Sequence, residues 1–122
     1  MMMNKNPQLG NIQDKIISEI MEFHHLTETD AKKFLSEIRS WCSRNITNSK
    51  WSNLDSNAKA TTSYGLKHVC ERDLDKYVAN NWMKAALYLE GFPIKKEKDR
   101  KKITIDDLFD NAVNFLFKDY GV

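Results

Sequence analysis

Apolar residues recur every three or four positions in several parts of the chain, which is the spacing of one face of an α-helix. The first such segment predicts a helix from about Asn11 to His24, and Asn11 with Asp14 resembles a capping box. Its apolar positions are Ile12, Ile16, Ile17, Ile20 and Phe23. A second capping pair, Thr27 with Asp30, precedes the most regular stripe in the sequence. That stripe consists of Ala31, Phe34, Leu35, Ile38, Trp41 and Cys42.

The middle of the chain predicts two shorter helices, Ser63–Leu74 and Asn80–Glu90, joined by residues 75–79. Their apolar positions are Leu66, Val69, Cys70 and Leu74 in the first helix, and Trp82, Ala85, Ala86 and Leu89 in the second. A helix pair joined by a short turn is the frame of helix-turn-helix modules that bind DNA. It is also the simplest way to pack two helices, so the pattern alone leaves both interpretations open.

The ends of these two helices carry recognisable signals. The candidate N-caps of the first helix are Thr61, Thr62 and Ser63. Asn80 is expected to cap the second helix, and Gly91 followed by Phe92 and Pro93 is typical of a Schellman stop. The second helix therefore has well-marked limits at both ends.

The last predicted helix begins at Thr104, which forms a capping pair with Asp107, and runs to Tyr120. Its apolar stripe consists of Ile105, Leu108, Phe109, Ala112, Val113, Leu116, Phe117 and Tyr120. Residues 44–62 are rich in Asn, Ser, Thr and Lys and predict a loop. In that loop Trp51 is either a lid on the core or an exposed anchor for a partner. No strand is predicted.

Together these segments predict an all-α fold, a single compact domain of about five helices with a central helix-turn-helix-like pair. Residues 1–10 are expected to be a flexible N-terminal leader, and residues 11–122 the helical domain. A chain of 122 residues has the size of one domain. The hydrophobic fraction of 41%, with 3 Trp, 4 Tyr and 6 Phe, is enough to build its core.

The composition predicts a soluble, cytoplasmic protein. Charged residues make up 30% of the chain, mean hydropathy is -0.62, and no apolar run approaches the ~18 residues that span a bilayer. The N-terminus has no apolar segment typical of a secretory signal. Cys42 and Cys70 both lie on apolar stripes, so we expect core thiols in a reducing compartment, with a disulfide or a metal site as the alternative.

The motifs of common enzymes are missing from the sequence. It contains no glycine-rich phosphate loop, no H-E-x-x-H and no G-x-S-x-G. The histidines and cysteines do not fall into paired metal-ligand spacings. His68 and Glu71 lie three residues apart on one predicted helix, where a structural pair is favoured over a catalytic one. We therefore predict a protein that is not an enzyme and has no cofactor and no metal.

Positive charge is concentrated in one segment. Residues 95–102 contain six basic and two acidic residues, a net charge of +4, whereas the whole chain has a net charge of +2. The other 114 residues therefore sum to -2. This segment is the sequence's candidate for binding an anionic partner.

Two kinds of partner fit the polar residues of this region. In a helix-turn-helix, Asn81, Lys84 and Tyr88 would face the major groove, and the basic segment would neutralise phosphates. The candidate nucleic-acid or partner-binding residues are Asn81, Lys84, Tyr88, Lys95, Lys96, Lys98, Arg100, Lys101 and Lys102. The turn lacks the glycine common in such motifs, and Glu97 and Asp99 interrupt the basic run.

A protein or nucleoprotein partner is the second kind. The basic segment could dock on a complementary acidic surface. The candidate aromatic anchors for such a partner are Tyr64, Tyr77, Trp51 and Tyr88.

The strings Ser63-Tyr64-Gly65-Leu66-Lys67-His68, Tyr77-Val78-Ala79-Asn80 and Gly91-Phe92 resemble a module of small phage and mobile-element proteins of low-GC bacteria. The resemblance covers about a quarter of the chain. Such modules are usually followed by a short strand-like tail, whereas residues 95–102 and a long C-terminal helix are expected here. The resemblance implies a mobile-element origin and a place in the cytoplasm of a bacterial host cell. Proteins of this size from that source are often inhibitors of defence nucleases, including anti-CRISPR proteins, or small DNA-binding regulators.

Three hypotheses follow from these features. The first is a non-catalytic helical binding protein that engages a host protein or nucleoprotein complex that handles nucleic acids, as an anti-CRISPR-type inhibitor of a defence nuclease. The second is a helix-turn-helix DNA-binding regulator, expected to be a dimer that binds duplex DNA sequence-specifically. The corresponding partner is DNA or RNA, contacted directly. The third is a small structural or assembly protein that forms a homodimer through the apolar stripe of residues 105–120. None of them involves a membrane.

Overall fold

The computed structural model describes residues 7–46 and 62–117, which form five helices and a two-stranded antiparallel sheet. In chain order they are α1 (Pro7–His24), α2 (Glu28–Asn45), α3 (Ser63–Leu74), α4 (Asn80–Leu89), β1 (Ile94–Lys96), α5 (Ile105–Leu108) and β2 (Phe115–Phe117). The prediction of a helical domain of about five helices with a central helix pair is confirmed. The prediction that the chain has no strand is wrong.

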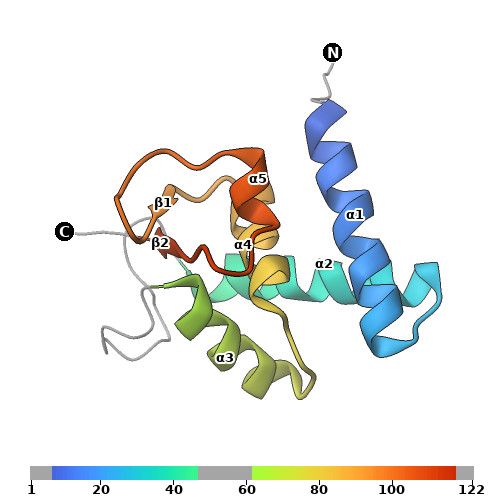
Figure 1. The fold of residues 1–122 in the computed structure, drawn as a ribbon. Coiled ribbons are helices and arrows are strands. Elements are labelled where there is room, and N and C mark those ends of the chain that lie inside the picture. Colours follow the sequence, from blue (N-terminus) through green and yellow to red (C-terminus); the bar gives the residue numbers. More distant parts are fainter. Residues whose placement is uncertain (1–6, 47–61, 118–122) are drawn as a thin grey trace, which may run out of the picture.

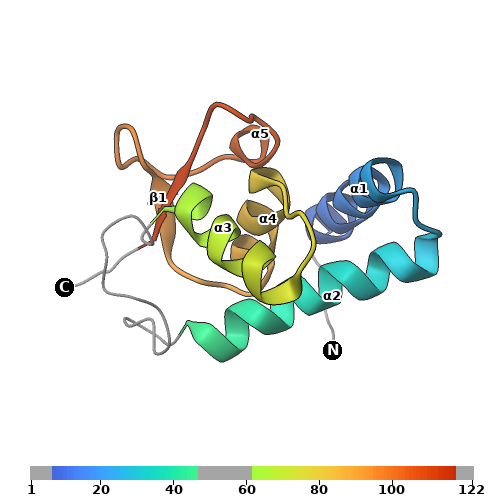
Figure 2. The same cartoon turned by 90° about the horizontal axis from the view of Figure 1, so that it is seen from below.

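Helix α4 lies at the centre of the molecule. It packs against α1, α2, α3 and α5, and Figures 1 and 2 show it enclosed between these elements. Each of its residues from Asn80 to Leu87 is buried. The largest buried side chains of the molecule include Trp41 of α2 and Trp82 of α4. The other elements are therefore arranged around α4, which has no face open to solvent over its first eight residues.

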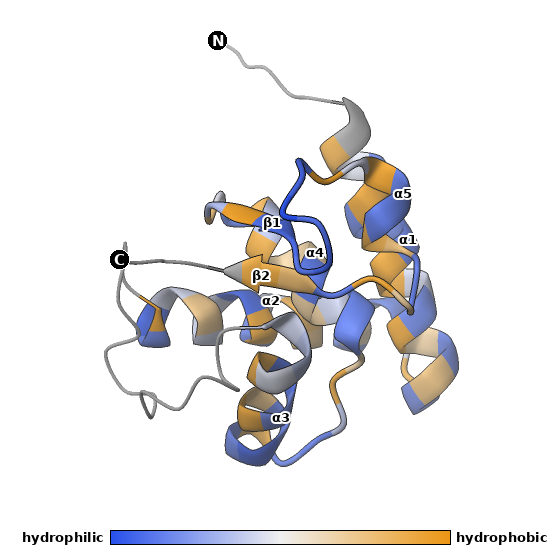
Figure 3. Ribbon diagram, turned by 60° about the vertical axis from the view of Figure 1, so that its left-hand side comes forward, coloured by the Kyte–Doolittle hydropathy of each residue, from blue (hydrophilic) through white to orange (hydrophobic). Residues whose placement is uncertain are grey.

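The first two helices form as their apolar stripes predict. Thr27 caps α2 by accepting a hydrogen bond from the Asp30 amide at 3.2 Å, and the whole predicted stripe of α2 is buried. Helix α1 begins at Pro7, so residues 7–10 are helical and do not belong to the expected leader. Proline suits the first turn of a helix because the amide it lacks would have no partner there. Figure 3 shows hydrophobic and hydrophilic bands alternating along α1.

The central pair has the predicted limits with one difference. Thr62 caps α3, since its hydroxyl accepts a hydrogen bond from the Gly65 amide at 3.0 Å. Helix α4 begins after Ala79 without a side-chain cap, so the prediction that Asn80 caps it is wrong. The Asn80 side chain instead donates to Asn114 Oδ1 at 2.8 Å, because its position faces the interior.

The predicted Schellman stop of α4 is confirmed. Gly91 has a φ of 80°, its amide donates to the Tyr88 carbonyl at 3.1 Å, and the Phe92 amide donates to the Leu87 carbonyl at 3.1 Å. A strand, β1, follows at Ile94–Lys96. No strand is predicted at this position, so β1 is a correction to the sequence-based prediction.

The long C-terminal helix is the main error of the sequence analysis. The capping box of Thr104 and Asp107 is present, but α5 ends at Leu108. The chain then turns and enters β2, which pairs with β1 in the register Ile94↔Phe117, Lys95↔Leu116 and Lys96↔Phe115. The carbonyls of Asp107 and Asp110, which a continuing helix would use, accept hydrogen bonds from Lys84 instead.

Two expectations fall outside the described residues. Most of the predicted loop of residues 44–62, including Trp51, lies there, as does the first part of the expected leader. Asn45 is the last residue of α2, so the beginning of the predicted loop is helical. The core formed by the described residues contains Cys42 and Cys70, as predicted.

Candidate partner-binding surfaces

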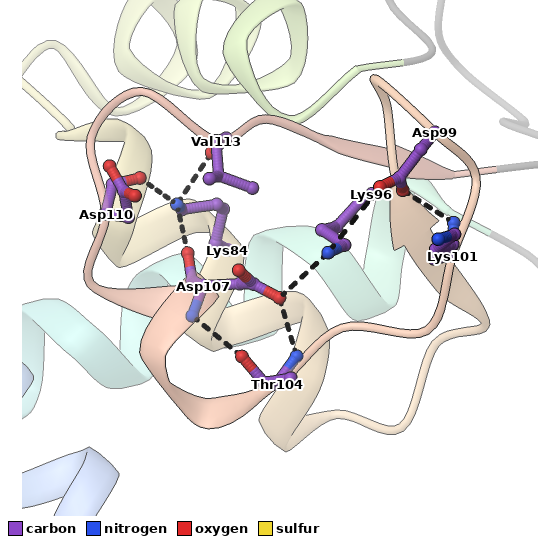
Figure 4. Close-up of polar contacts among 8 residues, drawn as sticks. All are labelled: Lys84, Lys96, Asp99, Lys101, Thr104, Asp107, Asp110 and Val113. Carbon is purple, nitrogen blue, oxygen red and sulfur yellow. Dashed lines mark hydrogen bonds and ion pairs between the residues drawn. The ribbon is translucent and has the colours of Figure 1, made fainter.

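Lys84 is the most unusual side chain of the interior. It is fully buried, and its ammonium donates to the carbonyl oxygens of Asp107 at 2.7 Å, Asp110 at 2.8 Å and Val113 at 2.7 Å (Figure 4). Burial lowers the pKa of Lys84 to about 8, although the carboxylates of Asp110 and Asp107 act to raise it. Lys84 therefore joins α4 to the segment after α5. The prediction that it contacts a partner is wrong, because all three of its donors point into the protein.

Asn81 and Tyr88, the other candidates on α4, are also not presented to solvent as a reading surface. Asn81 is 5% exposed, and its Oδ1 has no hydrogen-bond partner among residues 7–46 and 62–117, while Tyr88 is half-buried against the core. A recognition helix must offer several side chains of its first turns to base edges. Because residues Asn80 to Leu87 of α4 are buried, the helix has no such face. The prediction that Asn81 and Tyr88 form part of an exposed reading surface is therefore wrong.

The basic segment forms a hairpin, which we call the basic hairpin (residues 95–102). It leaves β1 and returns toward α5, with Arg100 at a φ of 61° in the turn. The Arg100 amide donates to the Lys96 carbonyl at 2.9 Å, and the Lys96 amide donates to the Lys101 carbonyl at 3.0 Å. The Glu97 amide donates to the Asn114 carbonyl at 2.9 Å. The backbone of this hairpin is thus held by hydrogen bonds and is not a free loop.

The two carboxylates of the basic hairpin are used to hold its turn. Asp99 accepts a hydrogen bond from the Lys101 amide at 2.9 Å, which lowers the pKa of the Asp99 carboxyl, and Glu97 accepts one from Asn114 Nδ2 at 3.2 Å. Lys96 Nζ lies 3.8 Å from an Asp99 oxygen and 4.0 Å from an Asp107 oxygen (Figure 4). Lys96 is therefore the structural cation of the hairpin.

The remaining cations of the basic hairpin are exposed. They are Lys95, Lys98, Arg100, Lys101 and Lys102. Among the described residues, no carboxylate pairs with any of their side chains. Five of the nine predicted site residues are thus brought together on the exposed basic hairpin, and Lys96 supports them from inside. Of the three on α4, Asn81 and Lys84 are buried and Tyr88 is half-buried against the core.

A second surface appears only in the structure. Phe23, Tyr64 and Tyr77 are 55%, 52% and 43% exposed, and they come from α1, α3 and the α3–α4 connection. Lys67 lies between the two tyrosines, so we call these four residues the aromatic strip. The sequence predicts Tyr64 and Tyr77 as candidate anchors, but it predicts Phe23 as part of the core stripe of α1. The helical spacing of Phe23 fits that stripe, and only its place at the end of α1 could have signalled exposure.

Glu71 organises the polar side of α3. It accepts hydrogen bonds from the Val78 amide at 3.1 Å, Lys67 Nζ at 3.2 Å and His68 Nδ1 at 3.1 Å. Burial raises the pKa of Glu71, but these three hydrogen bonds outweigh burial and lower it overall. The pairing of His68 with Glu71 belongs to this network, as the structural interpretation of the sequence predicted.

A groove of about 550 Å³ lies beside α2. Its lining includes Lys32, Ser36, Arg39, Ser43 and Glu90. Arg39 forms an ion pair with Glu90, and Glu90 also accepts a hydrogen bond from Ser43 at 3.1 Å. The charges at its centre are thus paired within the protein, and we assign this groove no ligand.

The two cysteines show no sign of reactivity. Both are fully buried and free of disulfides, and burial raises the pKa of Cys70 to about 12 and that of Cys42 well above its ordinary value. The described residues contain no group of three or more His, Cys, Asp or Glu side chains placed to hold a metal ion. No helix in the described part of the chain has the length and apolar character needed to cross a membrane.

Comparison of the chain with protein-family models, with curated proteins and with solved structures found no match in any of the three. Function must therefore be inferred from the two exposed surfaces, the basic hairpin and the aromatic strip.

Proposed function

We propose that the chain is a non-catalytic binding protein that docks its basic hairpin onto an anionic surface of a host complex that handles nucleic acids. One observation carries this proposal. Five exposed cations lie on a turn whose two carboxylates are bound to the hairpin's own backbone and to Asn114. A cationic turn of fixed shape can contact several phosphates or carboxylates at once, which favours fast and oriented association.

Separate observations support the proposal that the protein is not catalytic. The buried lysine that could serve as a base, Lys84, has all three donors committed to backbone carbonyls. His68, the histidine nearest to a carboxylate, belongs to the network that joins α3 to Val78 through Glu71. Within the described residues, the titratable groups with shifted pKa values therefore have structural roles or lie in the hairpin's turn.

The particular form of this proposal is an inhibitor of a defence nuclease, of the anti-CRISPR type. The resemblance of residues 63–92 to a mobile-element module supports it. A basic turn can occupy part of the anionic surface that a nuclease's guide or substrate presents.

The two alternatives from the sequence have less support. A helix-turn-helix regulator needs an exposed second helix, and the residues of α4 from Asn80 to Leu87 are buried. A homodimer through residues 105–120 needs an exposed apolar stripe. Leu108 and Phe115 of that stripe are buried in the chain's own core.

The proposal is tested by affinity capture from a bacterial lysate with three forms of the purified full chain, each with and without nuclease treatment. The first is the wild type. The second carries Lys95→Glu, Lys98→Glu, Lys101→Glu and Lys102→Glu. The third is a matched control with the same change in net charge at exposed cations elsewhere: Lys15→Glu, Lys32→Glu, Lys33→Glu and Arg72→Glu.

We expect the wild type and the matched control to retain a protein partner after nuclease treatment, and the hairpin variant to retain at least tenfold less of it. Equal retention by the hairpin variant would show that the hairpin is not the docking surface. Recovery of nucleic acid alone, lost on nuclease treatment, would replace the proposal with direct nucleic-acid binding. A plasmid-interference assay against a CRISPR nuclease then tests the inhibitor form.

A further inference from the structure

The exposed side chains of the basic hairpin are all charged. Residues 95–102 read Lys-Lys-Glu-Lys-Asp-Arg-Lys-Lys, and every one of them except Lys96 is exposed. The hairpin contains no aromatic ring on which a base could stack and no side-chain amide that could pair with adenine. Arg100 is its one guanidinium, which could pair with both major-groove acceptors of a guanine. The hairpin can therefore attract a polyanion, but it carries little that distinguishes one base from another.

The kind of cation separates a phosphate partner from an acidic protein surface. Four of the five exposed cations of the basic hairpin are lysines. The centres of protein–protein interfaces are depleted in lysine and enriched in Arg, Tyr, Trp and Met, which supply the anchors of such interfaces. None of the exposed large hydrophobic side chains of the described residues belongs to the hairpin; they are Leu9, Phe23, Tyr64 and Tyr77. The hairpin thus lacks the anchors of a protein interface, whereas lysine ammonium groups commonly neutralise phosphates as hydrated point charges.

Carboxylates of the surrounding segment do not pair with the exposed cations. Within residues 7–46 and 62–117, the ion pairs of the basic hairpin involve only Lys96, which faces Asp99 and Asp107. Figure 4 shows Asp110 beside Lys84, at the other end of this region from Asp99. The hairpin therefore keeps its net charge of +4 on side chains that are open to a partner.

The basic hairpin is braced by the residues around α5. Lys96 Nζ lies 4.0 Å from the Asp107 carboxylate, which also accepts a hydrogen bond from the Thr104 amide at 2.7 Å. The carbonyl oxygen of Asp107 accepts a hydrogen bond from the buried Lys84 at 2.7 Å. These contacts connect the base of the hairpin to α4 in the core. A partner therefore meets cations on a backbone that is already ordered, which reduces the entropy lost on association.

We infer that the anionic surface to which the basic hairpin docks is the phosphodiester backbone of a nucleic acid, contacted without selection for base sequence. This inference rests on the proposed function for the choice of surface, and it narrows the partner from phosphates or carboxylates to phosphates. Each neutralised phosphate of a DNA duplex contributes about -0.9 to the slope of the logarithm of the binding constant against the logarithm of salt concentration. With five exposed cations, about three to five contacts predict a slope of about -3 to -4.5.

The test titrates the full chain into fluorescently labelled probes and follows their anisotropy at several salt concentrations. The probes are two DNA duplexes of about 20 base pairs and unrelated sequence, one RNA duplex of the same length, and a polyglutamate peptide that represents the carboxylate alternative. The wild type is compared with the hairpin variant and the matched control of the capture experiment. A milder variant, Lys98→Gln with Lys101→Gln, removes two exposed ammonium groups and leaves the bond from the Lys101 amide to Asp99 in place. Thermal unfolding of each protein shows whether it is folded.

We expect the two DNA duplexes to bind within twofold of one another, with a salt slope in the predicted range, and polyglutamate to bind at least tenfold more weakly than either. The hairpin variant should bind DNA at least tenfold more weakly than the matched control. The slope of the milder variant should be less negative by up to about 2, or about 1 for each phosphate contact removed. The duplex that binds more tightly, DNA or RNA, identifies the source of the phosphates, and either result supports the inference.

Four results would each overturn the inference: polyglutamate binding as tight as DNA binding, a slope shallower than about -1, a tenfold preference for one DNA sequence, or an equal loss of binding in the hairpin variant and the matched control. If the hairpin variant does not fold, the slope of the milder variant decides. The proposed function fails separately. A protein partner retained through the hairpin without duplex binding would refute the inference alone, whereas duplex binding without a protein partner would refute the host complex alone.

Discussion

Replacing Lys84 by methionine is expected to lower the free energy of unfolding by about 3 kcal/mol. The ammonium of Lys84 makes three hydrogen bonds of 2.7 to 2.8 Å to backbone carbonyls, and each charge-assisted bond contributes about 2 kcal/mol. Together they amount to about 6 kcal/mol. Methionine has a similar length and removes the cost of burying the charge, which is about 3 kcal/mol because burial lowers the pKa of Lys84 from 10.5 to about 8, and this leaves the expected loss.

Urea unfolding followed by circular dichroism measures this loss. For a domain of this size, a slope of about 1.5 kcal/mol per molar urea converts the expected loss into a midpoint lower by about 2 M. Lys98→Met is the control, because Lys98 is exposed and its substitution should change the free energy of unfolding by less than about 0.5 kcal/mol. A midpoint shift of Lys84→Met below about 0.5 M would refute the reasoning. The cost of burying the charge would then cancel the hydrogen bonds completely.

Three further predictions concern the interior. The pKa of Lys84 is lowered from 10.5 to about 8, so the unfolded chain binds more protons than the folded chain between these values. The free energy of unfolding should therefore rise between pH 8 and pH 10.5 by up to about 3 kcal/mol more in the wild type than in Lys84→Met, and parallel pH profiles would contradict this. Cys42 and Cys70 should react with a thiol reagent only after unfolding, since both are fully buried and burial raises their pKa values. If the folded protein were labelled as fast as free cysteine, the result would contradict the burial of these thiols. Gly91→Ala should cost about 1 kcal/mol in urea unfolding, because the φ of 80° strains an L-residue while the space around the glycine is open; no measurable cost would argue against the Schellman stop.

The parts of the fold that the sequence predicted are those that depend on neighbouring residues. The stripe of α2, the cap at Thr27, the limits of α3 and the stop at Gly91 are all written in short-range patterns, and the structure contains each of them. Periodicity shows which face of a helix is most apolar. It does not show whether a second layer covers the polar face, and this is why Asn81 and Lys84 were assigned to the surface.

The C-terminal error has a similar cause. Residues 105–120 fit a helical stripe, but Lys84 takes backbone carbonyls of that segment and Ile94–Lys96 pairs with Phe115–Phe117. Both interactions join residues 19 or more positions apart, and a local pattern carries no information about them. The exposed cations of the basic hairpin were found because a run of charge is local, whereas the aromatic strip combines three separate elements and could be seen only in the structure.

The most direct measurement of the central claim places a photo-crosslinking residue on the basic hairpin. Replacing Lys98 by p-benzoylphenylalanine puts the probe at the exposed turn, and Lys33, exposed on α2, gives the matched control position. Both proteins are irradiated in nuclease-treated bacterial lysate, and crosslinked proteins are identified by mass spectrometry. The account predicts crosslinks from position 98, and not from position 33, to a subunit of a complex that handles nucleic acids. Equal crosslinking from both positions, or none from position 98, would contradict it.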